Sequence, residues 1–195
     1  MAVPYGGYYS YHNFEMTGKI AASGNVNSLL MEDEKTARTL SLSGRDACYF
    51  SLFNGCRSLT TAPELPSTTL AGGCYSSMFE GCTSLTTAPA ILPATTLADN
   101  CYNGMFKGCT SLTQAPELPA TTLASYCYIS MFYWCSNLNT IKLGYTDNFV
   151  DNYFGNWVEM VASKGTFYYN GSDTTQGVSA IPSGWTVSGW SVNGK

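Results

Sequence analysis

The apolar and polar positions between Leu70 and Gly81 follow the spacing of an amphipathic helix. The apolar half of a helical wheel holds Leu70, Ala71, Cys74, Tyr75, Met78 and Phe79, and the polar half holds Gly72, Gly73, Ser76, Ser77 and Glu80. Thr68 and Thr69 are suited to cap its start, and Gly81 to end it in a left-handed conformation. The pattern therefore predicts a short helix of about three turns.

A short extended piece follows this predicted helix at residues 84–89, which read Ser-Leu-Thr-Thr-Ala-Pro. Leu85 and Ala88 are its expected inward residues, and Pro89 ends strand pairing or lies at the rim of a sheet. Residues 92–96 (Leu-Pro-Ala-Thr-Thr) then return the chain to the next unit. Each unit is thus expected to contain one helix and one short strand.

The same frame recurs along the middle of the chain. Residues 74–85 (CYSSMFEGCTSL) are matched by residues 101–112 (CYNGMFKGCTSL). Cysteines eight residues apart mark each unit, and they are Cys48/Cys56, Cys74/Cys82, Cys101/Cys109 and Cys127/Cys135. Successive units begin 26, 27 and 26 residues apart. A fixed period of this size predicts a solenoid in which each unit buries its apolar side against its neighbours.

Stacking of such units places equivalent side chains in rows. The predicted rows are Leu59, Leu85, Leu112, Leu138; Phe53, Phe79, Phe106, Phe132; and Tyr49, Tyr75, Tyr102, Tyr128. The tyrosines fall on the apolar half of the wheel, so core packing is favoured over an aromatic binding stripe. The predicted fold is an α/β repeat, a short leucine-rich-repeat solenoid of about four 26-residue helix-plus-strand units with caps.

The two ends depart from the repeat and are expected to close it. Residues 1–46 form a tail and an N-terminal cap, residues 47–143 the repeats, and residues 144–195 a C-terminal cap, all in one compact domain. Within the last segment, residues 150–163 predict an amphipathic helix and residues 165–169 a strand. A turn is expected at 170–173 and a closing extended segment at 181–187.

The eight cysteines raise the question of disulfides. If residues 74–80 are helical, cysteines eight apart lie roughly 12 Å apart along the axis, beyond disulfide reach. Cross-repeat pairs such as Cys74 with Cys101 would lie closer together. Because unpaired cysteine is often buried as a small hydrophobe, buried thiols are favoured over disulfides.

Composition narrows the class of function. The chain is 45% hydrophobic but only 11% charged, with a net charge of −4. This deficit of Lys and Arg disfavours binding to nucleic acid and to anionic membranes. No run is long enough to cross a bilayer, and the first residues lack the pattern of a secretory signal.

No catalytic or metal-binding motif emerges, so the chain is predicted not to be an enzyme and to need no cofactor or metal. His12 is the single histidine, and the Cys-x7-Cys spacing is too wide for a zinc knuckle. The acidic cluster at residues 32–34 is typical of a solvated loop rather than a cation site. Glu64 and Glu117 occupy equivalent turns two units apart, which is unsuited to a glycosidase pair.

Residues 105–124 (Met-Phe-Lys-Gly-Cys-Thr-Ser-Leu-Thr-Gln-Ala-Pro-Glu-Leu-Pro-Ala-Thr-Thr-Leu-Ala) resemble BspA-like leucine-rich repeats. The resemblance extends from Ala47 to about Leu143, and the flanking segments are similar as well. It implies adhesion or recognition at a bacterial cell surface, or in an associated phage or prophage protein. It also implies a location outside the cell or on a virion exterior.

Two surfaces are candidates for recognition. The predicted strand face presents variable polar residues: Thr60, Thr61, Thr86, Thr87, Thr113, Gln114, Asn139 and Thr140. The fourth unit places Tyr126, Ile129 and Tyr133 on the half of the helix that is polar elsewhere, and Trp134 replaces its final glycine. Such a patch marks an interface, although coverage by the C-terminal cap is the favoured explanation.

These features lead to two hypotheses of function. The first is a non-enzymatic recognition or adhesion module that binds a host or bacterial protein or glycan through its repeat faces. The second is a structural or decorating component of a larger assembly, such as a phage fibre, docked through residues 1–14.

Overall fold

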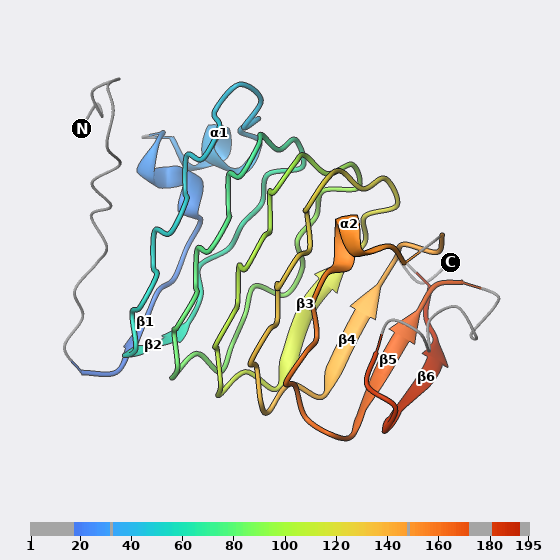
Figure 1. Ribbon diagram of the computed structural model, residues 1–195. Coiled ribbons are helices and arrows are strands. Elements are labelled where there is room, and N and C mark those ends of the chain that lie inside the picture. Colours follow the sequence, from blue (N-terminus) through green and yellow to red (C-terminus); the bar gives the residue numbers. More distant parts are fainter. Residues whose placement is uncertain (1–17, 32, 148, 172–180, 192–195) are drawn as a thin grey trace.

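The computed structural model describes residues 18–31, 33–147, 149–171 and 181–191, and these form a stack of coils (Figure 1). Backbone hydrogen bonds join residues 25 to 27 apart in successive coils. The Tyr75 N–H, for example, donates to the Cys101 carbonyl oxygen at 3.0 Å, and the Tyr102 N–H to that of Cys127 at 3.2 Å. The period of the sequence is therefore the length of one coil.

Two parallel sheets are formed by the extended parts of the coils (Figure 1). The first pairs β1 (Ile20–Ala21) with β2 (Leu59–Thr61). The second contains, in spatial order, β3 (Gln114–Leu118), β4 (Thr140–Leu143), β5 (Gly165–Tyr169) and β6 (Trp185–Gly189). Isolated parallel bridges, including Thr61 with Thr87 and Ile91 with Glu117, lie between them.

The prediction of helix-plus-strand leucine-rich-repeat units is wrong. In the described residues, α-helix is confined to α1 (Glu34–Arg38) and α2 (Asp151–Phe154), with one 3-10 helix at Val26–Leu29. Residues 72–81 and 101–108, expected to be helical, are consecutive turns instead. The structure is mostly sheet-like, and none of the four units contributes the predicted helix.

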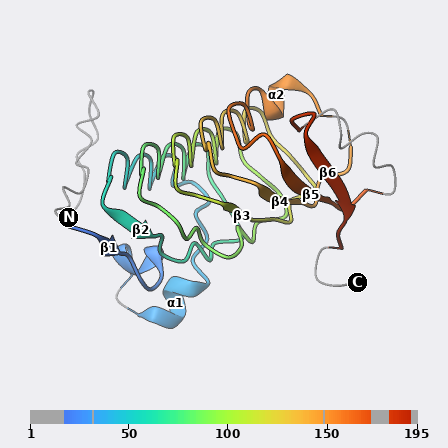
Figure 2. The same cartoon turned by 90° about the horizontal axis from the view of Figure 1, so that it is seen from below.

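Each run of turns bonds alternately within its own coil and to the next one. The Ser76 and Met78 N–H groups donate to carbonyl oxygens three residues earlier, as in a β-turn. The alternating residues Ser77 and Phe79 instead donate their N–H groups to the carbonyl oxygens of Asn103 and Met105 in the next coil. Figure 2 shows these runs of turns in a row along one side of the stack.

A left-handed residue recurs every four positions along each run of turns. Gly73, Ser77 and Gly81 have φ angles of 60°, 52° and 74°. Because glycine adopts such angles without steric cost, its frequency in the repeat has a backbone cause. A left-handed residue at every fourth position interrupts the right-handed backbone, so the α-helical ladder of i to i−4 hydrogen bonds does not form.

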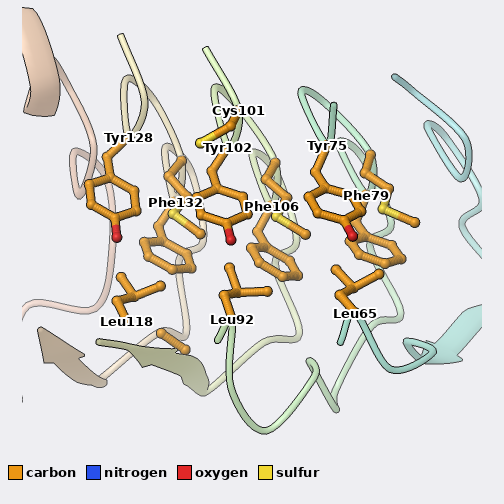
Figure 3. Packing of buried hydrophobic residues seen from close by; sticks show 14 of the residues in the cluster. Leu65, Tyr75, Phe79, Leu92, Cys101, Tyr102, Phe106, Leu118, Tyr128 and Phe132 are labelled. Atoms are coloured by element: carbon orange, nitrogen blue, oxygen red, sulfur yellow. The ribbon is translucent and has the colours of Figure 1, made fainter. Parts of the chain in front are cut away.

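The core lies between the runs of turns and the sheets, and it consists of the predicted rows. Tyr75 and Tyr102 stack with ring centroids 6.0 Å apart, and Phe79 and Phe106 with centroids 5.4 Å apart. Figure 3 shows the tyrosine row, the phenylalanine row and a row of Leu65, Leu92 and Leu118 packed together. The leucines of the predicted row are also fully buried. The tyrosine stripe is therefore core, as expected.

The N-terminal end is closed by a buried polar network around Asn27. Its Nδ2 donates to the Ala37 carbonyl oxygen at 2.9 Å and to Ser67 Oγ at 2.8 Å, while Tyr49 Oη donates to its Oδ1 at 2.9 Å. Asn27 is completely buried. One amide thus joins the 3-10 helix, α1 and the first two coils.

At the C-terminal end, the strand expected at residues 165–169 is confirmed as β5, and the closing segment contributes β6. The helix expected over residues 150–163 is mostly wrong, since α2 ends at Phe154 and turns follow to Met160. Phe154 and Trp157 of this segment pack on Tyr128 and Phe132 of the last repeat. The predicted turn at 170–173 lies partly outside the described residues.

Candidate binding surfaces

The predicted polar face carries paired residues along both sheets. Thr61 pairs with Thr87, and Gln114 with Thr140. The register continues to Thr166 and Thr186, which the repeat pattern missed because they lie beyond the last cysteine pair. The row is polar and solvated along its length.

The remaining residues of that face are partly engaged with the backbone of neighbouring coils. Thr60 Oγ1 donates to the Ile20 carbonyl oxygen at 3.0 Å, and Thr86 Oγ1 to that of Thr60 at 3.1 Å. The Asn139 N–H donates to the Thr113 carbonyl oxygen at 3.0 Å, and Asn139 Oδ1 accepts from Thr140 Oγ1. The Thr60 and Thr86 side chains thus help to hold coil against coil, so this part of the face has a structural role.

A hollow of about 200 Å³ lies beside this face, lined by Glu64, Leu65, Pro66, Pro89, Ala90, Ile91 and Pro93. Ile91 is the residue inserted in the second repeat, and it is 38% exposed. At one side Arg38 Nη1 pairs with Glu64 Oε2 at 2.7 Å. Nothing in the sequence predicted this hollow except the extra residue of the 27-residue unit.

The second predicted surface is divided by the structure. Tyr126 and Trp134 are 46% and 57% exposed, whereas Ile129 and Tyr133 are partly buried. Ile129 lies under the next coil, where its Cδ1 would be 3.6 Å from a Cβ built on Gly155. The expectation that the C-terminal segment covers the patch therefore fails for Tyr126 and Trp134.

Two neighbours complete an aromatic platform around Trp134. Tyr133 stacks on Trp134 with ring centroids 5.8 Å apart and an interplanar angle of 15°. Met160 occupies the position equivalent to Trp134 in the next coil, and it is 58% exposed. The two coils are joined there by the Trp134 N–H, which donates to the carbonyl oxygen of Glu159, the residue before Met160. We call Tyr133, Trp134 and Met160 the platform. Met160 was missed because it lies outside the cysteine-marked repeats.

The platform residues Trp134 and Met160 stand in a row that otherwise consists of glycine. Gly55, Gly81 and Gly108 have φ angles of 73°, 74° and 73°, and Trp134 and Met160 have 62° and 61°. A Cβ on Gly108 would make only ordinary contacts, the nearest at 3.7 Å. The backbone conformation, not crowding, therefore favours glycine in this row, and bulky residues there are strained.

A row of polar residues runs beside the glycine row. Lys107 Nζ pairs with Glu80 Oε1 of the previous coil at 2.9 Å. The next two members of the row are Tyr133 and the exposed Glu159. Beyond the platform along the chain lie the exposed Ser136 and Asn137, and Asn137 Nδ2 donates to the Thr110 carbonyl oxygen at 2.7 Å. The row beside the platform thus carries the Lys107–Glu80 ion pair on one side of Tyr133 and the Glu159 carboxylate on the other.

The cysteines belong to the core rather than to a site. All eight are free, and all but Cys48 are buried, as the preference for buried thiols predicted. Burial raises the pKa of Cys82 and of Cys135 to about 12, which keeps these thiols protonated and unreactive at neutral pH. Within the described part of the chain, no three His, Cys, Asp or Glu side chains gather in a metal-binding cluster.

The two glutamates of equivalent turns each form an ion pair of their own. Glu64 pairs with Arg38, and Glu117 Oε1 pairs with Lys142 Nζ at 2.7 Å. In the predicted acidic cluster, Asp33 caps α1 by accepting from the Thr36 N–H at 2.7 Å. Residues 1–14, the proposed assembly contact, lie outside the described residues.

Comparisons of the chain with protein-family models, with curated proteins and with solved structures gave no match. Among the helices of the described residues, none has the length and apolar character needed to span a membrane.

Proposed function

We propose that this protein is a non-enzymatic recognition module that binds a protein or glycan at a bacterial cell surface or on a virion exterior. The observation that carries the proposal is the exposure of Trp134 in a left-handed conformation, at a position where three earlier coils have glycine. Strained residues and exposed aromatic side chains both concentrate where proteins bind their ligands.

The regularity of the stack supports the same proposal. Rows of buried aromatic rings and leucines form a regular core, and the surface differs from coil to coil at a few solvent-exposed positions. Binding surfaces built on such repeats use these outward positions while the core remains constant. The resemblance of residues 47–143 to BspA-like repeats favours adhesion or recognition, although the helix-plus-strand units that the apolar pattern predicted are absent there.

The test measures binding of the labelled full chain to intact gut bacterial cells, to host matrix proteins and to mucin glycans in parallel. Saturable binding to any of the three surfaces is the expected result. Binding to bacterial cells alone favours bacterial recognition, and binding to matrix or mucin favours host adhesion. Absence of saturable binding to all three contradicts the proposal.

Two variants assign the bound face. Thr87→Lys with Gln114→Lys places charge on the polar row of the sheets, and Trp134→Gly removes the largest exposed side chain of the platform. We expect the double variant to bind as the unmodified protein does and the Trp134 variant to bind weakly. The opposite result would move the site to the sheet face.

A further inference from the structure

The platform has the size of a small rigid ligand rather than of a protein partner. Full burial of one aromatic side chain removes roughly 150–250 Å² from water, so the exposed parts of Tyr133, Trp134 and Met160 offer on the order of 300 Å². A stable protein interface needs about 800 Å² on each side. An area of a few hundred Å² matches one or two sugar rings.

The shape of the platform also favours a flat ligand. The rings of Tyr133 and Trp134 are stacked and nearly parallel, at 15°, so Tyr133 supports the Trp134 ring from one side while 57% of Trp134 remains exposed. The face of an aromatic ring carries negative charge density, and it attracts the partly positive C–H groups on the apolar face of a pyranose ring. Met160 extends the apolar surface by one coil.

The border of the platform supplies partners for hydroxyl groups. Glu159 is exposed and follows Tyr133 in its row one coil on, and the exposed Asn137, three residues after Trp134, is held in place by its bond to the Thr110 carbonyl oxygen. Lys107 is the nearest cation in the adjoining row, and it is paired with Glu80 at 2.9 Å. A strongly anionic ligand would therefore meet the Glu159 carboxylate and an already compensated lysine.

We infer that the Tyr133–Trp134–Met160 platform binds a neutral glycan by stacking a sugar ring on Trp134, with Glu159 and Asn137 hydrogen-bonding its hydroxyls. This inference rests on the proposed recognition function and specifies its ligand class. The left-handed backbone at Trp134 and Met160 directs their side chains toward solvent. The glycines of the same row in the earlier coils have no side chain to present.

The experiment uses the full chain and an array of neutral oligosaccharides built from glucose, galactose, mannose, N-acetylglucosamine and N-acetylgalactosamine. We expect saturable binding to at least one of them and a loss of about tenfold or more in Trp134→Gly, since one buried aromatic ring contributes that much affinity. Trp134 is the most exposed of the four tryptophans. Its emission should therefore shift to the blue on binding, and this shift should vanish in the variant.

Tyr126→Gly is the matched control. Tyr126 is also an exposed aromatic residue in a left-handed conformation (φ 61°), but it lies at the far end of the same run of turns. The same strain is relieved without touching the platform, so glycan binding should be unchanged. Equal binding by the Trp134 and Tyr126 variants would overturn the inference.

The oligosaccharide array and the cell-binding test distinguish failure of the glycan inference from failure of the proposed recognition function. Binding to cells, matrix or mucin with no saturable binding to any neutral oligosaccharide would leave the recognition function standing and overturn the glycan inference. Preference for acidic over neutral oligosaccharides would overturn it as well.

Discussion

The Cys109 thiol donates a hydrogen bond to the carbonyl oxygen of Phe79, one coil earlier, across 3.1 Å. Cys82 and Cys135 repeat this contact with Phe53 and Phe106, both at 3.0 Å. The second cysteine of the second, third and fourth repeats therefore links coil to coil inside the core. Its chemistry is that of a small buried donor, with no need of a disulfide or a metal.

Cys109→Ala should lower the free energy of unfolding by about 1–2 kcal/mol, through the lost hydrogen bond and a small cavity. The cost stays moderate because the Phe79 carbonyl oxygen keeps the Cys82 N–H as a partner. Urea unfolding measures the change. Cys48→Ala, at the partly exposed cysteine, is the control and should cost less; equal costs would argue against the thiol contact.

Stability should fall at alkaline pH. Burial raises the pKa of Cys82 and of Cys135 from 9.0 to about 12, and that of Tyr102 well above its ordinary value. The unfolded chain loses these protons from about pH 9, so the contribution is complete below pH 9 and is lost as the pH rises toward 12. Each thiol contributes a slope of about 1.4 kcal/mol per pH unit in that window.

The measurement is the urea midpoint at intervals between pH 7 and pH 11. We expect a plateau up to about pH 8.5 and a steep fall above it. A midpoint that stays constant from pH 9 to pH 11 would show that the thiols and phenols are accessible to water in the native state.

Asn27→Ala should destabilise the protein by about 2–4 kcal/mol, because it leaves the buried Tyr49 hydroxyl, Ser67 hydroxyl and Ala37 carbonyl without the amide between them. Asn137→Ala removes one exposed bond to Thr110 and should cost under about 1 kcal/mol. Thermal unfolding compares the two. Similar losses in both variants would mean that the network does not hold the N-terminal cap.

Two glycines should resist substitution for different reasons. Gly108→Ala should cost about 1 kcal/mol through its left-handed backbone alone, since a Cβ there has room. At Gly165 a Cβ would lie 2.5 Å from the Asn139 carbonyl oxygen and 2.6 Å from the Trp185 ring, so Gly165→Ala should cost at least about 2 kcal/mol. Gly189→Ala, in open space, is the control for both in denaturant unfolding. The reverse order would contradict this assignment.

The sequence predicted the period and the core rows because both depend only on which residues are apolar and how they recur. Inward residues such as Cys74, Tyr75, Met78 and Phe79 alternate at spacings of one and three, which fit a helical face and a four-residue turn repeat equally well. Periodicity could not decide between them, since the difference lies in where the backbone N–H groups donate. Glycines four apart, such as Gly104 and Gly108, were the signal for turns.

The candidate sites were also predicted only in part from the sequence. Departure of the fourth unit from the frame identified Trp134, because a glycine position filled by tryptophan is visible in the alignment of repeats. Its exposure and the contribution of Met160 needed the structure, since both depend on how the turns after α2 continue the stack. The polar row proved engaged with neighbouring coils, which hydroxyl-rich composition alone does not reveal.

The most direct test of the account is the affinity of Trp134→Gly for the cell, matrix or mucin surface that the unmodified protein binds, with thermal unfolding measured on the same samples. Glycine relieves the left-handed strain at position 134, so the melting temperature should stay equal or rise. We predict that binding falls by about tenfold or more while the fold persists. Undiminished binding by a folded Trp134→Gly protein would contradict the claim that this residue is held outward for recognition.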